Sequence, residues 1–460
     1  MSIRDAFFKI SSVLPEVPKP KQKPSLTERL IWTLLAVVLY LLMAQIPLYG
    51  VLKSSSSLLF FYQIIFAANI GTLMTLGIGP IVTAGLIAQV LMGSDLIHLD
   101  LTNPDDQKFF ASITKILTFV FIIAESVFYV LSGVVGTTLS PYATVIVIFQ
   151  LIIATSIVFL LDQMLQKGWG IGSGISLFIL AGISLQIMLD LFSPIPVDGQ
   201  YFGYIPYAIN ETIHRAYMNI VNRPANFPDL IGLISTILFA LLILYLEGVR
   251  IEIPISSSKF KGFSATYPIK LLYVSNIPVI LVAALIADFQ FFFAMLAKNP
   301  AIYNHITWLG TVQNGTFTGG LLYYVSTPPP VPLAFHHPVQ VITYSLFVII
   351  LSVVFAKLWV DVSGMSAEKA AETIISSDLQ IPGFRTTRTT IGSLLNRYIP
   401  VVTLFSGLLI GIIAAASTLL NVYGTGIGLL LVIDISISYY QMLAQEQLIS
   451  TVPGLGGLFE

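Results

Sequence analysis

The chain has 460 residues, of which 56% are hydrophobic and only 10% are charged, and its formal net charge is −1 at pH 7. Soluble domains carry about 25% charged residues, so this composition excludes an ordinary soluble protein and indicates a polytopic membrane protein. The sequence contains no cysteine, which excludes disulfides, thiolate metal sites and cysteine nucleophiles. Its five histidines show no metal-ligand spacing, and neither a metal nor a cofactor is expected.

The N-terminal region is predicted to form a short amphipathic helix over residues 2–14, where apolar residues recur at helical spacing. Such a helix is expected to lie on the membrane surface. The Pro-rich, basic run over residues 15–24 is expected to be an extended linker. Ser25 and Glu28 then have the spacing of a capping box, which predicts that the first membrane-spanning helix starts there.

Ten apolar runs are predicted to cross the membrane, whose hydrocarbon core is about 30 Å thick. They lie at about 30–49, 74–92, 109–132, 142–165, 172–190, 228–248, 269–296, 338–360, 398–420 and 427–446. An even number of spans places both termini on one side. Of the 22 Lys and Arg residues, 18 fall on that side, which the positive-inside rule identifies as the cytoplasm.

The second run contains the sequence Gly77-Ile78-Gly79-Pro80, in which glycine weakens a helix and proline removes a backbone donor. A broken helix at membrane depth is tolerated only where it is buried in protein or lines a water-filled path. The apolar segment before it, residues 54–66, is too short to span the membrane. Together they indicate a pore or a binding site, although a kinked packing helix also explains this stretch.

Aliphatic residues lie beside three glycine-rich stretches. Ile78 and Val82 are four residues apart, as are Ile175 and Ile179, so each pair shares a helix face. Leu429 follows a third glycine-rich stretch in a similar way. Ordinary helix packing explains any one pair taken alone.

The loops differ in charge. Two long cytoplasmic loops, residues 249–268 and 361–398, are basic, which suits docking to a polyanion such as the ribosome. They could instead only enforce the topology. Two long outer loops cover about 191–227 and 297–337, and five spans precede the first of them, which fits an inverted repeat of five helices.

Three acidic residues, Glu125, Asp288 and Asp434, fall inside predicted spans, where a charge is costly and usually faces a cavity or a partner. A proton-coupled secondary transporter is therefore the alternative function. Against it, no Lys or Arg lies central enough to pair with these acids. The sequence offers neither a nucleophile with a convincing base nor a nucleotide-binding loop.

Four stretches are long and specific. They are GTLMTLGIGPIVTAG, WGIGSGISLFI, RIEIPISSSKFKGFSATYPIKLLYVSNIPVIL and GFRTTRTTIGSLLNRYIP. Together they resemble the SecY family, the large (alpha) subunit of the protein-conducting Sec translocon, in its archaeal form. The resemblance extends from about Glu28 to about Gln447. It implies an all-α fold of ten transmembrane helices in two pseudo-symmetric halves, residues 1–195 and 196–460, around an hourglass pore.

The resemblance further implies a passive channel, not an enzyme, that conducts secretory polypeptides across the membrane and releases transmembrane segments sideways into lipid. Six aliphatic side chains would form a ring that closes it: Ile78, Val82, Ile175, Ile179, Ile280 and Leu429. Such an apolar constriction resists wetting and blocks ions. A plug over about 55–66 would lie against the ring from outside, built from Ser57, Leu58, Leu59, Phe60, Phe61, Tyr62, Ile64 and Ile65.

A lateral gate is implied where Thr83, Glu125 and Asp288 occupy the positions of the family's polar cluster. The last position is often asparagine in relatives, and two neighbouring acids repel each other unless one binds a proton. The expected partners are the ribosome, signal sequences and nascent chains, the lipid bilayer, and small SecE-type (gamma) and beta-type membrane subunits. The ribosome would dock on the basic loops through Arg250, Lys259, Lys261, Arg385 and Arg388. The expected location is the cell (plasma) membrane.

Overall fold

The computed structural model describes residues 3–22, 24–51, 63, 66–93, 99, 103–131, 140–197, 199–221, 223, 227–257, 264–274, 277–297, 303–313, 316–331, 333–377, 379–384 and 387–451. Three predicted docking residues, Lys259, Lys261 and Arg385, lie outside this part of the chain, as do all eight predicted plug residues.

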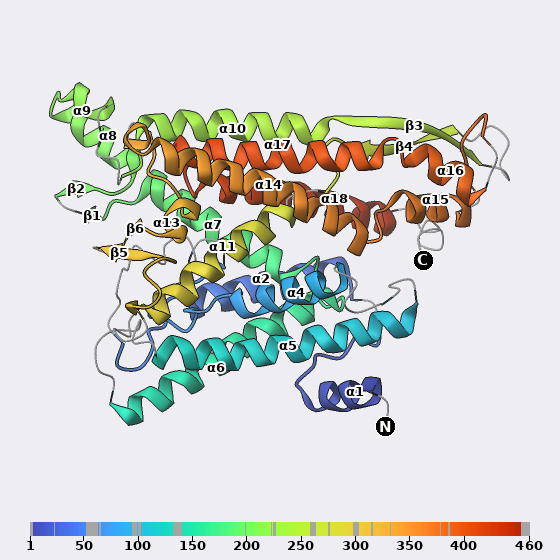
Figure 1. Cartoon of the computed structure of the whole chain (residues 1–460), viewed down its shortest axis with the longest axis horizontal. Coiled ribbons are helices and arrows are strands. Elements are labelled where there is room, and N and C mark those ends of the chain that lie inside the picture. The colour runs from blue at the N-terminus through green and yellow to red at the C-terminus, as the bar shows by residue number, and fades with distance from the viewer. Residues whose placement is uncertain are drawn as a thin grey trace.

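Long helices lie side by side along the longest axis of the molecule (Figure 1). They are α2 (Leu26–Met43), α4 (Gly79–Gly93), α5 (Pro104–Leu131), α6 (Pro141–Gln166), α7 (Gly174–Phe192), α10 (Leu230–Gly248), α11 (Ile277–Leu296), α14 (Pro338–Val362), α17 (Ile399–Leu419) and α18 (Gly426–Thr451). Each predicted apolar run overlaps one of them. Within the described ranges eight helices are long and apolar enough to span a membrane, while α4 and α11 are shorter apolar helices.

Short elements gather at the two ends of this bundle (Figure 1). One end carries α1 (Ile3–Val13), β3 (Arg250–Ser257), β4 (Ser264–Lys270), α15 (Ala367–Ser376), β7 (Leu379–Gln380) and α16 (Arg388–Leu395). The other carries β1 (Pro196–Val197), β2 (Gln200–Tyr201), α8 (Tyr204–Ile213), α9 (Tyr217–Val221), β5 (Thr311–Gln313), β6 (Thr316–Gly319), α13 (Leu321–Val325) and η2 (Leu333–His336). The basic loops and α1 therefore share one end, as the charge distribution predicts.

The capping box predicted at the start of α2 is confirmed. The Ser25 hydroxyl accepts a hydrogen bond from the Glu28 N–H at 3.3 Å, and the Glu28 carboxylate accepts one from the Ser25 N–H at 2.8 Å. These bonds satisfy two backbone donors that a helix start otherwise leaves unpaired.

The second predicted span begins later than expected, so the prediction of a helix from residue 74 is wrong. Helix α4 starts only at Gly79, and residues 66–78 form buried turns before it. Gly77 has φ +55°, which a helix cannot continue through, and Pro80 lies in the first turn, where its missing N–H costs nothing. The helix break predicted from the glycines and the proline is thus the start of the helix.

The seventh predicted span is also shorter than expected. Residues 264–270 form strand β4, which pairs with β3 from Arg250↔Lys270 to Ser256↔Ser264, and α11 starts at Ile277. The alternation of β4 places Tyr267 and Ile269 on its more buried face, while Thr266 and Pro268 are exposed. The start of this predicted span therefore consists of the end of a strand, at Ile269 and Lys270, and of the turns at residues 271–274.

Strand β7 joins the two basic loops. It lies in the second loop and pairs with β3 of the first through Ser256↔Gln380 and Ser257↔Leu379, giving the sheet order β4-β3-β7. This sheet shares a separate apolar core with α15 and α16, which includes Ile253, Ile374 and Ile391. The two loops thus form one folded unit at one end of the bundle.

Candidate functional site

All six predicted ring residues belong to the large apolar core that the long helices share. Ile78, Ile179 and Leu429 are almost completely buried, and Val82, Ile175 and Ile280 pack against the same cluster while half-buried. They come from α4 and the turn before it, α7, α11 and α18. Helix α18 packs on α7, and α11 packs on both α4 and α18, so contacts run from α7 through α18 and α11 to α4.

Ile78 is positioned by the turns that precede α4. Its N–H donates to the Phe66 carbonyl at 2.9 Å, and a Cβ atom on the neighbouring Gly77 would lie only 2.1 Å from that same oxygen. The Tyr40 hydroxyl of α2 donates to the carbonyl of Ala67. Tyr40 also stacks on Phe178 of α7, with ring centroids 4.7 Å apart. Contacts with α2 and α7 therefore position the turns that lead to Ile78.

Helix α7, which carries Ile175 and Ile179, is positioned at its start by Asp162 of α6. The Asp162 carboxylate accepts a hydrogen bond from the Ile175 N–H at 3.0 Å and another from the Ser173 hydroxyl at 3.4 Å. A carboxylate at this end of the helix also interacts favourably with the helix dipole. Asp162, an acid near the end of a predicted span, thus has a structural role.

Two of the three predicted gate residues are in direct contact. The Thr83 hydroxyl of α4 lies 3.0 Å and 3.2 Å from the two carboxyl oxygens of Asp288 on α11. The same hydroxyl lies 2.9 Å from the Gly79 carbonyl, and since it has one hydrogen it donates to one of these acceptors at a time. This contact joins a helix from the first half of the chain to one from the second.

Glu125 of α5 is the third predicted gate residue, and its side chain is buried. Within the described part of the chain, neither of its carboxyl oxygens has a hydrogen-bond partner. Asp288 lies near enough to act on it electrostatically. The structure therefore places the three predicted residues near one another on three helices, with two acids close enough to interact electrostatically.

An aromatic contact at the same junction was missed by the sequence reasoning. Tyr129 of α5 stacks on Phe291 of α11, with ring centroids 6.0 Å apart and planes 14° from parallel. Both side chains are buried, and each lies about one turn beyond a predicted gate residue, Glu125 or Asp288. The i+4 and i+3 spacing was the available signal, but aromatic residues are too frequent in this chain for it to stand out.

The acids proposed for a proton relay do not form one cluster. Asp434 of α18 lies beside Glu247 of α10, whereas Glu125 and Asp288 lie at the junction of α5 and α11. Asp190 of α7 accepts a hydrogen bond from the Gly424 N–H at 3.0 Å, just before α18. In the part of the chain that the structure describes, no group of three or more acids and histidines could hold a metal ion.

Comparison with known proteins agrees with this geometry. The family model of SecY matches residues 72–440, and that of the plug domain of Sec61p matches residues 38–71. The protein translocase subunit SecY of Sulfolobus acidocaldarius is 41% identical over 98% of both chains, and that of Pyrococcus horikoshii is 37% identical over 100% of both. The chain belongs to the SecY family. As a member it is a multi-pass membrane protein and the channel subunit of a protein translocase.

Solved structures of SecY relatives share the fold. "The structure of a protein conducting channel" matches with a TM-score of 0.82 at 35% identity, covering 97% of this chain and 98% of that chain. Sec61 in a canine ribosome–channel complex from the endoplasmic reticulum matches with a TM-score of 0.80 at 34% identity and the same coverage. The matched plug domain covers the plug predicted at 55–66, and the transporter alternative finds no support among these SecY relatives.

Proposed function

We propose that the six aliphatic residues close a passive polypeptide channel, and that α4 and α5 part from α11 and α14 to form its lateral gate. The observation that carries this proposal is that all six side chains belong to the apolar core, three of them almost completely buried, on helices that contact one another from α7 through α18 and α11 to α4. Flexible aliphatic side chains exclude water and ions from a constriction, yet they can separate around a chain of any sequence.

We propose that the channel has no enzymatic activity of its own and that a partner supplies the energy for transport. We expect it in the cell membrane with both termini in the cytoplasm. The uneven distribution of Lys and Arg supports this orientation, and the basic loops and α1 lie at the same end of the bundle (Figure 1).

The ribosome is the proposed partner at the cytoplasmic end, where Arg250 and Arg388 are exposed on the unit that β3 and β7 hold together. The related Sec61 and yeast Ssh1 proteins have been solved as ribosome complexes. We further expect SecE-type (gamma) and beta-type membrane subunits to cover part of the exposed apolar surface of the long helices.

Site-specific crosslinking tests the proposed path. A photoreactive residue at Ile175 or Ile280 is expected to crosslink to a stalled secretory chain in reconstituted vesicles, because the chain passes through the ring. Ile153 of α6 is the matched control, since its side chain is 57% exposed on the outside of the bundle. Translocation without crosslinks at Ile175 and Ile280 would contradict the ring and require another path.

A further inference from the structure

Helix α1 packs along the first turns of α5 and runs in the same direction. Arg4 forms an ion pair with Asp106 at 2.8 Å, Phe7 meets Phe109 with ring centroids 5.8 Å apart, and further contacts continue toward Lys115. The cytoplasmic end of α5 therefore has a second helix fastened to it before the chain reaches the membrane-spanning α2.

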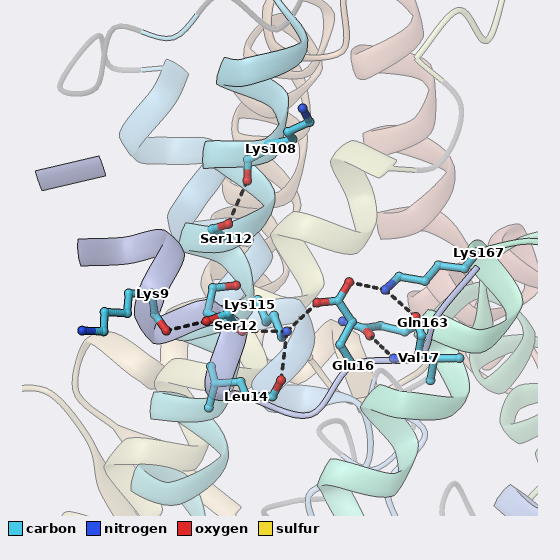
Figure 2. A network of polar contacts seen from close by, with 11 residues as sticks. Lys9, Ser12, Leu14, Glu16, Val17, Lys108, Ser112, Lys115, Gln163 and Lys167 are labelled. Atoms are coloured by element: carbon cyan, nitrogen blue, oxygen red, sulfur yellow. Dashed lines mark hydrogen bonds and ion pairs between the residues drawn. The ribbon is translucent and has the colours of Figure 1, made fainter. Parts of the chain in front are cut away.

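Lys115 of α5 holds the end of α1 (Figure 2). Its ammonium group donates to the Ser11 carbonyl at 2.9 Å, to the Leu14 carbonyl at 3.1 Å and to the Glu16 carboxylate at 2.8 Å. These three bonds use all three of its donors, and its side chain is only 7% exposed. A cation at the C-terminal end of a helix is also favoured by the helix dipole.

Residues 14–18, which we call the N-terminal strap, continue from this point to α6 and the turn after it. Glu16 forms a second ion pair with Lys167, whose ammonium also donates to the Val17 carbonyl at 2.6 Å (Figure 2). Gln163 accepts from the Val17 N–H at 3.3 Å, and the Trp169 indole donates to the Pro18 carbonyl at 2.8 Å. Side chains from two helices and a turn thus hold the strap.

The turn reached by the strap leads directly into α7. Arg29 of α2 donates to the Gly170 carbonyl at 3.0 Å, and Asp162 binds the first turn of α7. Ile175 of the ring lies five residues beyond Gly170. At its other end the strap is bonded to α5, which carries the gate residue Glu125. The strap therefore connects the helix of the gate to the start of a helix of the ring.

Glu16 is the shared member of both ion pairs. Hydrogen bonds from Lys115 and Lys167 lower the pKa of its carboxyl group from 4.5 to about 2, so it stays ionised at neutral pH. Without this anion, the buried Lys115 ammonium keeps its two carbonyl acceptors but loses its charged partner while the Lys167 cation stays nearby, which weakens the attachment of the strap to α5 and α6.

We propose that Glu16 is a positioning residue that couples the cytoplasmic end of α5 to the turn before α7 and thereby favours the closed gate. Loss of its charge frees α5 to move away from α6, so the gate opens more often and accepts weaker signal sequences. This inference rests on the proposed function, because it takes α5 as a gate helix.

The test combines a distance measurement with a translocation assay on the full chain in its complex. The sequence has no cysteine, so spin labels can be placed at Ala111 of α5 and Lys357 of α14, both exposed, without background. The variants are Glu16→Gln, Glu16→Asp and Lys167→Gln. Asp105→Asn is the matched control, since it removes an exposed carboxylate 3.6 Å from Lys108 on the same end of α5.

Glu16→Gln is expected to broaden the distance distribution and to raise transport of a precursor with a defective signal sequence by roughly fivefold. Lys167→Gln should change both measurements in the same direction. Glu16→Asp keeps the charge and should therefore lie between Glu16→Gln and the unmodified protein. Asp105→Asn should change neither the distance distribution nor the transport of the defective precursor. Signal-sequence stringency is the degree to which the channel rejects precursors with defective signal sequences. If Glu16→Gln changes neither the distances nor this stringency while Asp288→Asn does shift the stringency, the inference about Glu16 is wrong and the proposed gate stands. If neither Glu16→Gln nor Asp288→Asn changes the stringency, both this inference and the proposed gate are wrong.

Discussion

Gly77 leaves no room for a side chain beside the ring. Its φ of +55° disfavours any L-residue, and a Cβ atom would lie 2.1 Å from the Phe66 carbonyl oxygen. Gly77→Ala is therefore expected to displace the turns that hold Ile78, at a cost of about 2 kcal/mol or more in the free energy of unfolding. Thermal unfolding in detergent and ion conductance across a planar bilayer measure the two consequences, lower stability and leakage through the ring.

Gly85 is the matched control for this prediction. It lies within α4, and a Cβ atom there would have no neighbour within 4 Å. Gly85→Ala should therefore be neutral or stabilising by up to about 1 kcal/mol, because alanine favours a helix more than glycine does. Equal effects of the two substitutions would show that space at Gly77 is not what positions the ring.

The contact of Thr83 with Asp288 joins α4 to α11 at the proposed gate, which makes Asp288→Asn informative. The asparagine can still accept a hydrogen bond from the Thr83 hydroxyl, but the substitution removes one of the two acids that interact electrostatically at this junction. We expect normal transport of intact precursors and a closed state favoured by about 1 kcal/mol, so that precursors with defective signals pass roughly fivefold less often.

The same stringency assay with Asp361→Asn supplies the control. Asp361 is exposed near the end of α14, away from the Thr83 contact, and its change should leave stringency as it is. If Asp288→Asn also leaves stringency unchanged, the contact between α4 and α11 does not set the balance of the gate.

Local pattern predicted the long helices and part of the site. Apolar runs located ten helices, and the spacing of Ser25 and Glu28 located a helix start, because both signals are short-range. The predicted starts of α4 and α11 were wrong because apolar turns and the end of a strand cannot be separated from an apolar helix by composition alone. The contacts of Glu16 with Lys115 and Lys167 join residues about 100 and 150 positions apart, which no local pattern encodes.

At the scale of the whole molecule, two sets of polar contacts join the predicted N-terminal half of the chain to the C-terminal half, and they involve different kinds of groups. Around α7 and α18, Asp190 binds the Gly424 N–H and the Tyr439 hydroxyl donates to the Ser173 carbonyl at 2.8 Å. Between α4 and α11, Thr83 meets Asp288. The first pair includes backbone groups beside helix starts, whereas the second joins two side chains that rotate freely when the helices separate. This difference favours opening on the side of α4 and α11.

The folded unit of the two basic loops, which contains the sheet β4-β3-β7, gives a last prediction for the assembled molecule. Arg250 and Arg388 are 57% and 55% exposed, and the sheet β4-β3-β7 fixes the two loops that carry them to one another. Reversing both charges should weaken ribosome binding by roughly tenfold near 0.15 M salt, with a smaller effect at high salt, because cations that contact phosphates release counterions. Co-sedimentation with ribosomes over a salt series measures this.

Two further variants separate docking from local repulsion. Arg250 lies 3.0 Å from Glu252 and Arg388 lies 3.6 Å from Glu372, so charge reversal also places like charges together within the unit. Replacing both arginines by glutamine removes the docking charges without that repulsion and should weaken binding by an intermediate amount. Arg215→Glu, exposed at the opposite end of the bundle, should have no effect. Binding that is weakened equally at every salt concentration would mean that the ribosome does not recognise these cations through its phosphates.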